Sequence, residues 1–99
     1  MRLTYPTALV LQALVNGHHH GFDIMDATAL PSGTVYPILR RLDAAGLVRS
    51  TWEREGVARR EQRPPRRYYE LSSAGVIVAR EAAARYRGRP RSLAVKAGA

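Results

Sequence analysis

Cysteine is absent from the 99-residue sequence. Disulfide bonds, thiolate zinc sites and thiol nucleophiles are therefore excluded together, as suits a reducing compartment. Long apolar runs are also absent, since none approaches the roughly 20 residues that a membrane-spanning helix needs. The first 16 residues are too short and too weakly apolar for a secretion signal. We expect a cytoplasmic protein without a membrane partner.

Acidic residues are few, because eight Asp and Glu stand against 16 Lys and Arg, giving a formal net charge of +8. Nearly all of the cations are arginine. Guanidinium groups form paired hydrogen bonds with phosphate and with guanine edges, so this composition favours nucleic acid as a partner. The alternative is a basic surface that is merely solvated.

Apolar residues recur at helical spacing in three segments of the first half. These segments are residues 5–16, 22–28 and 32–45. Gly46 follows the third segment, where glycine commonly ends a helix. Ser32 follows a proline turn, and its hydroxyl is placed to cap the third helix. We therefore expect three short helices in succession.

The second half of the sequence predicts a hairpin and a last helix. Strands are expected at 47–53, where apolar and polar residues alternate, and at 67–71. Arginine, glycine and proline dominate 54–65, which indicates a long loop between the strands. Residues 72–87 predict an apolar-rich helix, and residues 88–99 a basic tail.

Three helices, a hairpin with a basic loop and a further helix follow the order of a winged helix-turn-helix. Several motifs also match one family in the same order: His20 to Ile24, Leu30 to Leu42, Gly46 to Val48, Trp52-Glu53, Arg67 to Leu71, and Gly75. With these motifs the chain resembles the PadR family, the phenolic-acid-responsive repressors and their relatives.

The resemblance implies a mainly α fold with a two-stranded β-hairpin (α+β). Residues 1–71 would form a winged helix-turn-helix domain that binds double-stranded DNA, close to the nucleoid. Residues 72–87 would form a C-terminal dimerisation helix, followed by the tail at 88–99. The family implies a homodimer built from the first and last helices, and the broad apolar surface of the last helix favours a partner. Gly88 and Pro90 interrupt that helix early, which sets this sequence apart from its relatives.

The helix that begins at Ser32 is the candidate DNA-reading element, because the major groove of B-DNA admits one helix. Its apolar residues share one face, which leaves Tyr36 and Arg40 on the outer side. The alternative for Tyr36 is packing against the second helix or the hairpin. The candidate contacts of this helix are Ser32, Gly33, Thr34, Tyr36, Pro37, Arg40 and Arg41.

The basic loop is the candidate wing. Its candidate contacts are Arg59, Arg60 and Arg63. Arg66 and Arg67, at the base of the second strand, are expected to stay near the hairpin and touch the DNA backbone. Three roles remain open for the loop arginines, namely gripping phosphates, entering the minor groove, or no contact with DNA.

Trp52 suggests a ligand platform, because some PadR relatives bind a small aromatic effector between subunits. However, Val48, Ser50 and Trp52 alternate with polar neighbours that include Glu53, and this favours core or interface packing for Trp52.

The run from His18 to His20 suggests a metal site, but adjacent side chains diverge and cannot chelate one ion together. We expect no metal, no cofactor and no catalytic residue, since no nucleophile lies near a base in the sequence. The function that we expect is transcriptional repression by promoter occupancy. The alternatives are a protein that compacts nucleic acid without regard to sequence, and a protein-interaction adaptor or antagonist of another regulator.

Overall fold

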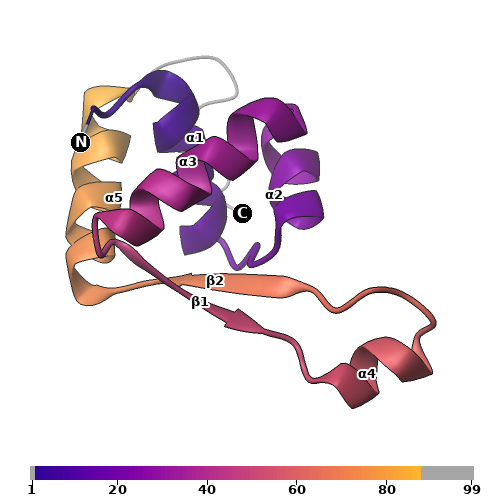
Figure 1. Ribbon diagram of the computed structural model, residues 1–99. Helices are drawn as coiled ribbons and strands as arrows, with labels where there is room; N and C mark the ends of the chain where they lie inside the picture. The colour runs from indigo at the N-terminus through magenta and orange to yellow at the C-terminus, as the bar shows by residue number, and fades with distance from the viewer. Residues whose placement is uncertain (1, 88–99) are drawn as a thin grey trace.

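The computed structural model describes residues 2–87 and consists of five helices and a two-stranded antiparallel sheet (Figure 1). The elements are α1 (Tyr5–Val15), α2 (Gly21–Thr28), α3 (Ser32–Ala44), β1 (Val48–Trp52), α4 (Glu55–Arg60), β2 (Arg67–Leu71) and α5 (Ser73–Arg85). The expectation of a mainly α fold with one hairpin is confirmed. The tail at 88–99 lies outside the described residues. Among the described helices, none has the length and apolar character needed to cross a membrane.

The core lies where α1, α2, α3 and α5 meet above the hairpin. The inner side of α3 is fully buried at Val35, Leu39 and Leu42, in register with the helical period. Leu11 of α1 and Ile24 of α2 are also fully buried in this cluster. The inner face of α3 is therefore committed to packing, and its outer face is left for other partners.

A three-residue turn joins α2 to α3. Ala29 ends α2 in the left-handed conformation (φ 61°), and the Thr28 hydroxyl accepts from the Leu30 amide at 3.2 Å. Pro31, not Ser32, caps α3, so the predicted Ser32 cap is wrong. The reason is that extended Pro31 offers its carbonyl to the amides of Thr34 and Val35, which makes Ser32 the first helical residue.

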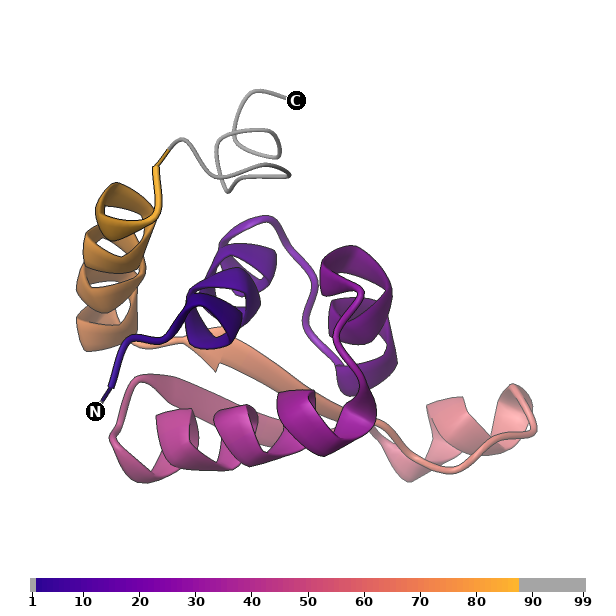
Figure 2. The same ribbon diagram turned by 90° about the horizontal axis from the view of Figure 1, so that it is seen from above.

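The hairpin pairs β1 with β2 in the register Val48 to Leu71 and Trp52 to Arg67. It extends beyond the helical body, as Figure 2 shows. Because β1 ends outside the core, Trp52 is 65% exposed. Core packing of Trp52 is therefore a wrong prediction, whereas interface packing stays a prediction. The predicted alternation also fails at Glu53, which lies past the strand and has only 6% of its side chain exposed.

A short helix, α4, occupies the segment that the sequence suggested was a loop. Glu55 and Arg59 form an ion pair at helical spacing (2.8 Å), which supports such a turn. Ala58 is buried on the inner side of the wing, and its carbonyl accepts from the Arg63 amide. The wing, residues 54–66, is therefore a small ordered lobe, and the prediction of a loop throughout 54–65 is wrong at α4.

The last helix, α5, packs against α1 in the same core. The Ser72 hydroxyl caps α5 by accepting from the Gly75 amide at 3.1 Å, as the sequence predicted. Gly75 is buried directly against the Leu47 carbonyl, which also accepts from the Ser72 amide. At the other end of α5, the Tyr86 hydroxyl donates to the Leu3 carbonyl at 2.6 Å. The hairpin and α5 are thus joined at a tight junction.

We predict that Gly75→Ala lowers the free energy of unfolding by about 1–3 kcal/mol, because the added methyl group would collide with the Leu47 carbonyl oxygen. Gly33→Ala is the matched control. No atom beyond the chain neighbours and helix backbone lies within 4 Å of the methyl position at Gly33, and alanine favours a helix by about 1 kcal/mol. Urea denaturation of both variants checks this, and equal stability changes would contradict the account of the junction.

Candidate nucleic-acid interface

The outer face of α3 presents two arginines to solvent. Arg40 and Arg41 are exposed, and no ion-pair partner is found for either among residues 2–87. Gly33 is also exposed at the start of α3, with open space where a side chain would be. Ser32 is exposed and Thr34 half-buried beside it. The first turn of the helix is therefore accessible at its backbone.

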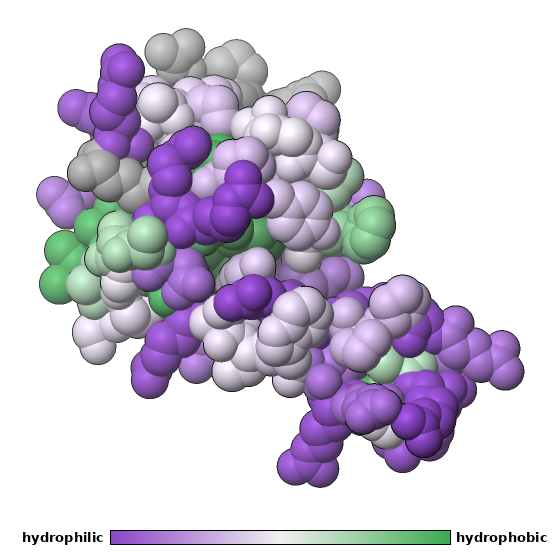
Figure 3. Space-filling view, viewed as in Figure 1, coloured by the Kyte–Doolittle hydropathy of each residue, from purple (hydrophilic) through white to green (hydrophobic). Residues whose placement is uncertain are grey.

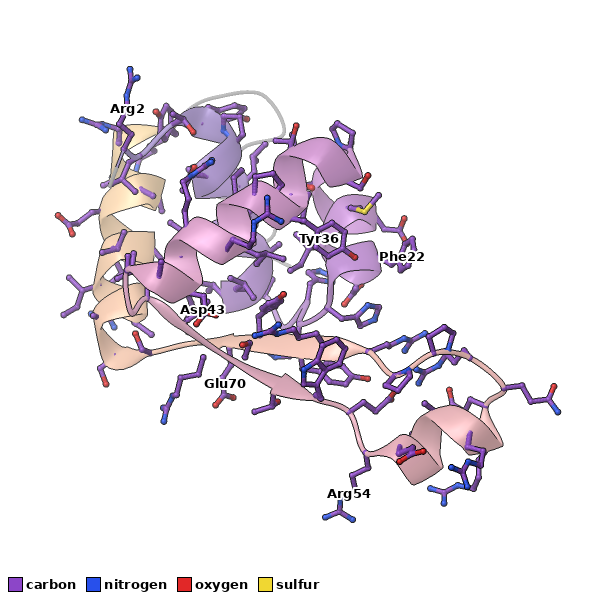
Figure 4. The ribbon with its side chains drawn as sticks, in the orientation of Figure 1. Arg2, Phe22, Tyr36, Asp43, Arg54 and Glu70 are labelled. Atoms are coloured by element: carbon purple, nitrogen blue, oxygen red, sulfur yellow. The ribbon has the colours of Figure 1, made fainter. Side chains whose placement is uncertain are left out.

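Tyr36 is half-buried and lies against the start of α2. A methyl group added at Gly21 would collide with the Tyr36 phenol, so the absence of a side chain at Gly21 makes room for the ring. Figure 4 shows Tyr36 on α3 beside α2, which carries Phe22. Tyr36 therefore packs against the second helix, as one of the two sequence interpretations proposed. Part of the residue remains accessible to solvent. Pro37 is half-buried within α3.

A carboxylate holds the base of the wing together. Glu53 accepts from both terminal nitrogens of Arg63, at 2.6 and 2.7 Å. The Arg66 amide and the Tyr68 hydroxyl donate to the same carboxylate, at 3.2 and 3.1 Å. These hydrogen bonds, with that of Arg63 first, lower the pKa of Glu53 to about 2. The same pair raises the pKa of Arg63 above its ordinary range.

Arg63, which the sequence suggested as a DNA contact, is therefore engaged within the wing. Its side chain is only 19% exposed and also contacts Glu61 at 3.1 Å. Sequence reasoning missed this pair because ten residues separate Glu53 from Arg63, and no local spacing rule links them.

Other wing arginines point to solvent. Arg59 and its partner Glu55 are both more than three-quarters exposed, so their ion pair is weak and easily exchanged. Arg54 and Arg60 are exposed as well, and Figure 4 shows Arg54 directed away from the body. Strongly hydrophilic side chains cover the lobe in Figure 3. The wing thus offers an exposed basic surface on an ordered base.

Two further arginines lie near α3, namely Arg67, which the sequence placed at the base of the hairpin, and Arg2, which the sequence did not single out. Arg67 of β2 donates to the Ser50 hydroxyl at 2.8 Å and lies 5.4 Å from the Trp52 ring centre. Arg2 lines a hollow of about 550 Å³ together with Arg41 of α3. The contacts of Arg67 with Ser50 and Trp52 join residues far apart in the sequence, so sequence spacing gave no indication of them.

The three histidines have separate partners. The ring of His18 bonds with Asp23 (2.9 Å) and that of His19 with the Tyr69 carbonyl (2.9 Å), while His20 forms an isolated bridge to Tyr68. No group of potential metal ligands is found within residues 2–87. The histidine segment ties the connection between α1 and α2 to the hairpin.

Residues 10–81 match the model of the transcriptional regulator PadR-like family. The chain belongs to this family. No curated protein matches the sequence. A PadR family regulator from Eggerthella lenta is 29% identical and superposes with a TM-score of 0.61, over 79% of this chain and 70% of that one.

Two further solved structures share the fold. A PadR family transcription regulator from Clostridium difficile superposes with a TM-score of 0.72 at 22% identity, over 85% of this chain and 88% of that one. A transcriptional regulator from Clostridium thermocellum gives 0.62 at 21% identity, over 78% and 75% of the two chains. The family match at residues 10–81 begins within α1, ends within α5 and includes the whole hairpin of the PadR-like chain.

We predict that Glu53 makes the PadR-like fold acid-sensitive. Because its pKa falls from 4.5 to about 2 on folding, its contribution is complete above pH 4.5 and is lost as the pH falls toward 2. In Glu53→Gln the melting temperature should be lower at neutral pH and should change less between these two pH values. Melting curves across this range test the point, and an unchanged pH slope in the variant would refute it.

Proposed function

We propose that this PadR-like regulator reads duplex DNA with the outer face of α3. The observation that carries the proposal is that Arg40 and Arg41 stand exposed and unpaired, within the described residues, on the helix whose opposite face is wholly buried. Guanidinium groups bind guanine edges and phosphates, and α3 fits the major groove as a recognition helix. This placement supports sequence-specific binding.

The contacts divide by position. Amides in the first turn of α3, at Ser32, Gly33 and Thr34, are placed for a phosphate, since a helix start attracts anions. Arg40 is placed for a base edge, and the exposed part of Tyr36 for a phosphate or a thymine methyl. Pro37 shapes the same face, and Arg41 flanks it.

In the wing, Arg59 and Arg60 supply affinity by gripping phosphates or by entering the minor groove, joined by Arg54. Arg63 is left out of this set because its guanidinium is hydrogen-bonded to Glu53. Arg66 is kept as a contact at the wing base.

The regulator acts as a repressor, in this proposal, by occupying promoters as a homodimer in the cytoplasm. Val76 and Ile77 of α5 are exposed apolar side chains, 37% and 58% accessible, and Figure 3 shows hydrophobic side chains along the edge that α5 forms. A two-fold dimer through α1 and α5 would cover them. Its two recognition helices would meet half-sites about 34–36 Å apart, or at a multiple of that spacing.

We predict a division of labour between Arg40 and Arg60. DNA selected from a random duplex library by the native protein should contain one palindrome. Arg40→Ala should bind that palindrome about tenfold more weakly and relax the preference at one base position, because a base contact is lost. Arg60→Ala should weaken all sequences alike and reduce the salt slope by about one unit.

Equal losses on the selected palindrome and on mixed-sequence DNA for both variants would contradict this division. Failure to enrich any sequence, with uniform binding throughout, would favour compaction of DNA instead. An absence of DNA binding at low salt would favour a protein-interaction adaptor.

We also predict that Ile77→Glu reduces the dimer to a monomer, because a charge would replace an apolar contact at the proposed interface. Sedimentation equilibrium measures the association, with Arg80→Ala on the same exposed side as a control that keeps the apolar pair. A variant that remains as dimeric as the native chain would place the interface elsewhere.

A further inference from the structure

A recess opens between the start of α2, α3 and the base of the wing. It has a volume of about 450 Å³ and runs between two body elements and the hairpin. It is bordered by aromatic and proline side chains and by arginines. The residues that matter here are Phe22, Tyr36, Trp52, Arg66, Arg67 and Tyr69.

The charge of this recess is of one sign. No Asp or Glu lines it, whereas Arg66 and Arg67 do. Burial, with the nearby charge of Arg66, lowers the pKa of His20 and so favours its uncharged form. The adjacent Glu53 is occupied by Arg63 and its other donors. An anion is the complementary occupant.

Arg67 is held in position from several sides. It donates to Ser50, lies over the rings of Trp52 (5.4 Å) and Tyr69 (6.0 Å), and is 3.9 Å from Asp43 on α3. The contact between Arg67 and Asp43 is long, and both side chains are nearly half exposed. Such a contact orients the guanidinium and leaves it able to bind another anion. Arg67 is therefore a preorganised donor beside the recess.

Two large aromatic side chains that border the recess are exposed to solvent. Trp52 is 65% and Phe22 is 69% accessible, and they lie on the hairpin and on α2 respectively. Exposed aromatic surface next to arginines fits a partner that has both an apolar ring and a negative charge. The sugar and phosphate of a nucleotide combine these two properties.

Resting on the proposed function, we propose that this recess seats the phosphodiester backbone that separates the two grooves. A recognition helix in the major groove and a wing in the adjacent minor groove have one backbone strand between them. The recess lies between α3 and the wing, where that strand would pass. Arg66 and Arg67 bind its phosphate, and the Trp52 ring packs against a deoxyribose.

The test uses the full chain and a mixed-sequence duplex of about 30 base pairs, near three turns of B-DNA, at low salt. Trp52 is the only tryptophan of the chain, so its fluorescence reports on this site alone. Duplex should change that emission. By anisotropy of labelled duplex, Trp52→Ala should bind about tenfold more weakly, with Thr51→Ala as a control on the opposite face of the same strand.

A second pair of variants tests the charge independently of Trp52. Arg67→Gln should weaken binding and reduce the salt slope by about one unit, because one phosphate contact is lost. Arg49→Gln makes the same charge change on the other face of the hairpin. It should change the salt slope by much less than Arg67→Gln does. Circular dichroism verifies that all variants are folded.

The outcomes separate this inference from the function on which it rests. Duplex binding with unchanged Trp52 emission, and with Trp52→Ala equal to Thr51→Ala, would overturn the recess proposal and leave DNA binding intact. No duplex binding at low salt would overturn both. A change in Trp52 emission with benzoate but not with duplex would assign the recess to a small aromatic anion and so overturn the proposal.

Discussion

Burial of one face of α3 is the constraint on which the rest of the structure depends. Val35, Leu39 and Leu42 are fully buried against α1 and α2, and a helix with 3.6 residues per turn must then turn Arg40 outward. Rotating the helix would expose these side chains and cost about 1.5–3 kcal/mol for each one. The exposed arginines of α3 are therefore a geometric consequence of the core.

The second requirement is an ordered wing, and electrostatics supplies it. The lobe at 54–66 has little apolar surface of its own to bury, apart from Ala58. The carboxylate of Glu53 instead gathers the Arg63 side chain and the Arg66 amide into one place. An ordered lobe loses less conformational entropy on binding than a free loop, so its exposed arginines are better placed for association.

Periodicity alone predicted α1, α2, α3 and α5, because their buried stripes follow the helical repeat in the sequence. It failed where a distant contact decides the structure. The Glu53–Arg63 pair and the contacts of Arg67 with Ser50 and Trp52 depend on tertiary geometry, and the contact of Tyr36 with Gly21 was one of two alternatives that the sequence left open. For the same reason α4 was missed, since its order depends on packing inside the wing. The outer face of α3 was predictable from the sequence, whereas the recess beside it was not.

The central claim is that α3, the recess and the wing form one continuous surface for duplex DNA. Nuclear magnetic resonance of the isotope-labelled chain, with and without duplex, tests this most directly. The account predicts that the largest shifts fall on the outer face of α3, on the Trp52 indole and on residues 54–66, while Arg49 and Glu70 on the other hairpin face stay unchanged. Shifts concentrated at Arg49 and Glu70, with α3 unaffected, would contradict it.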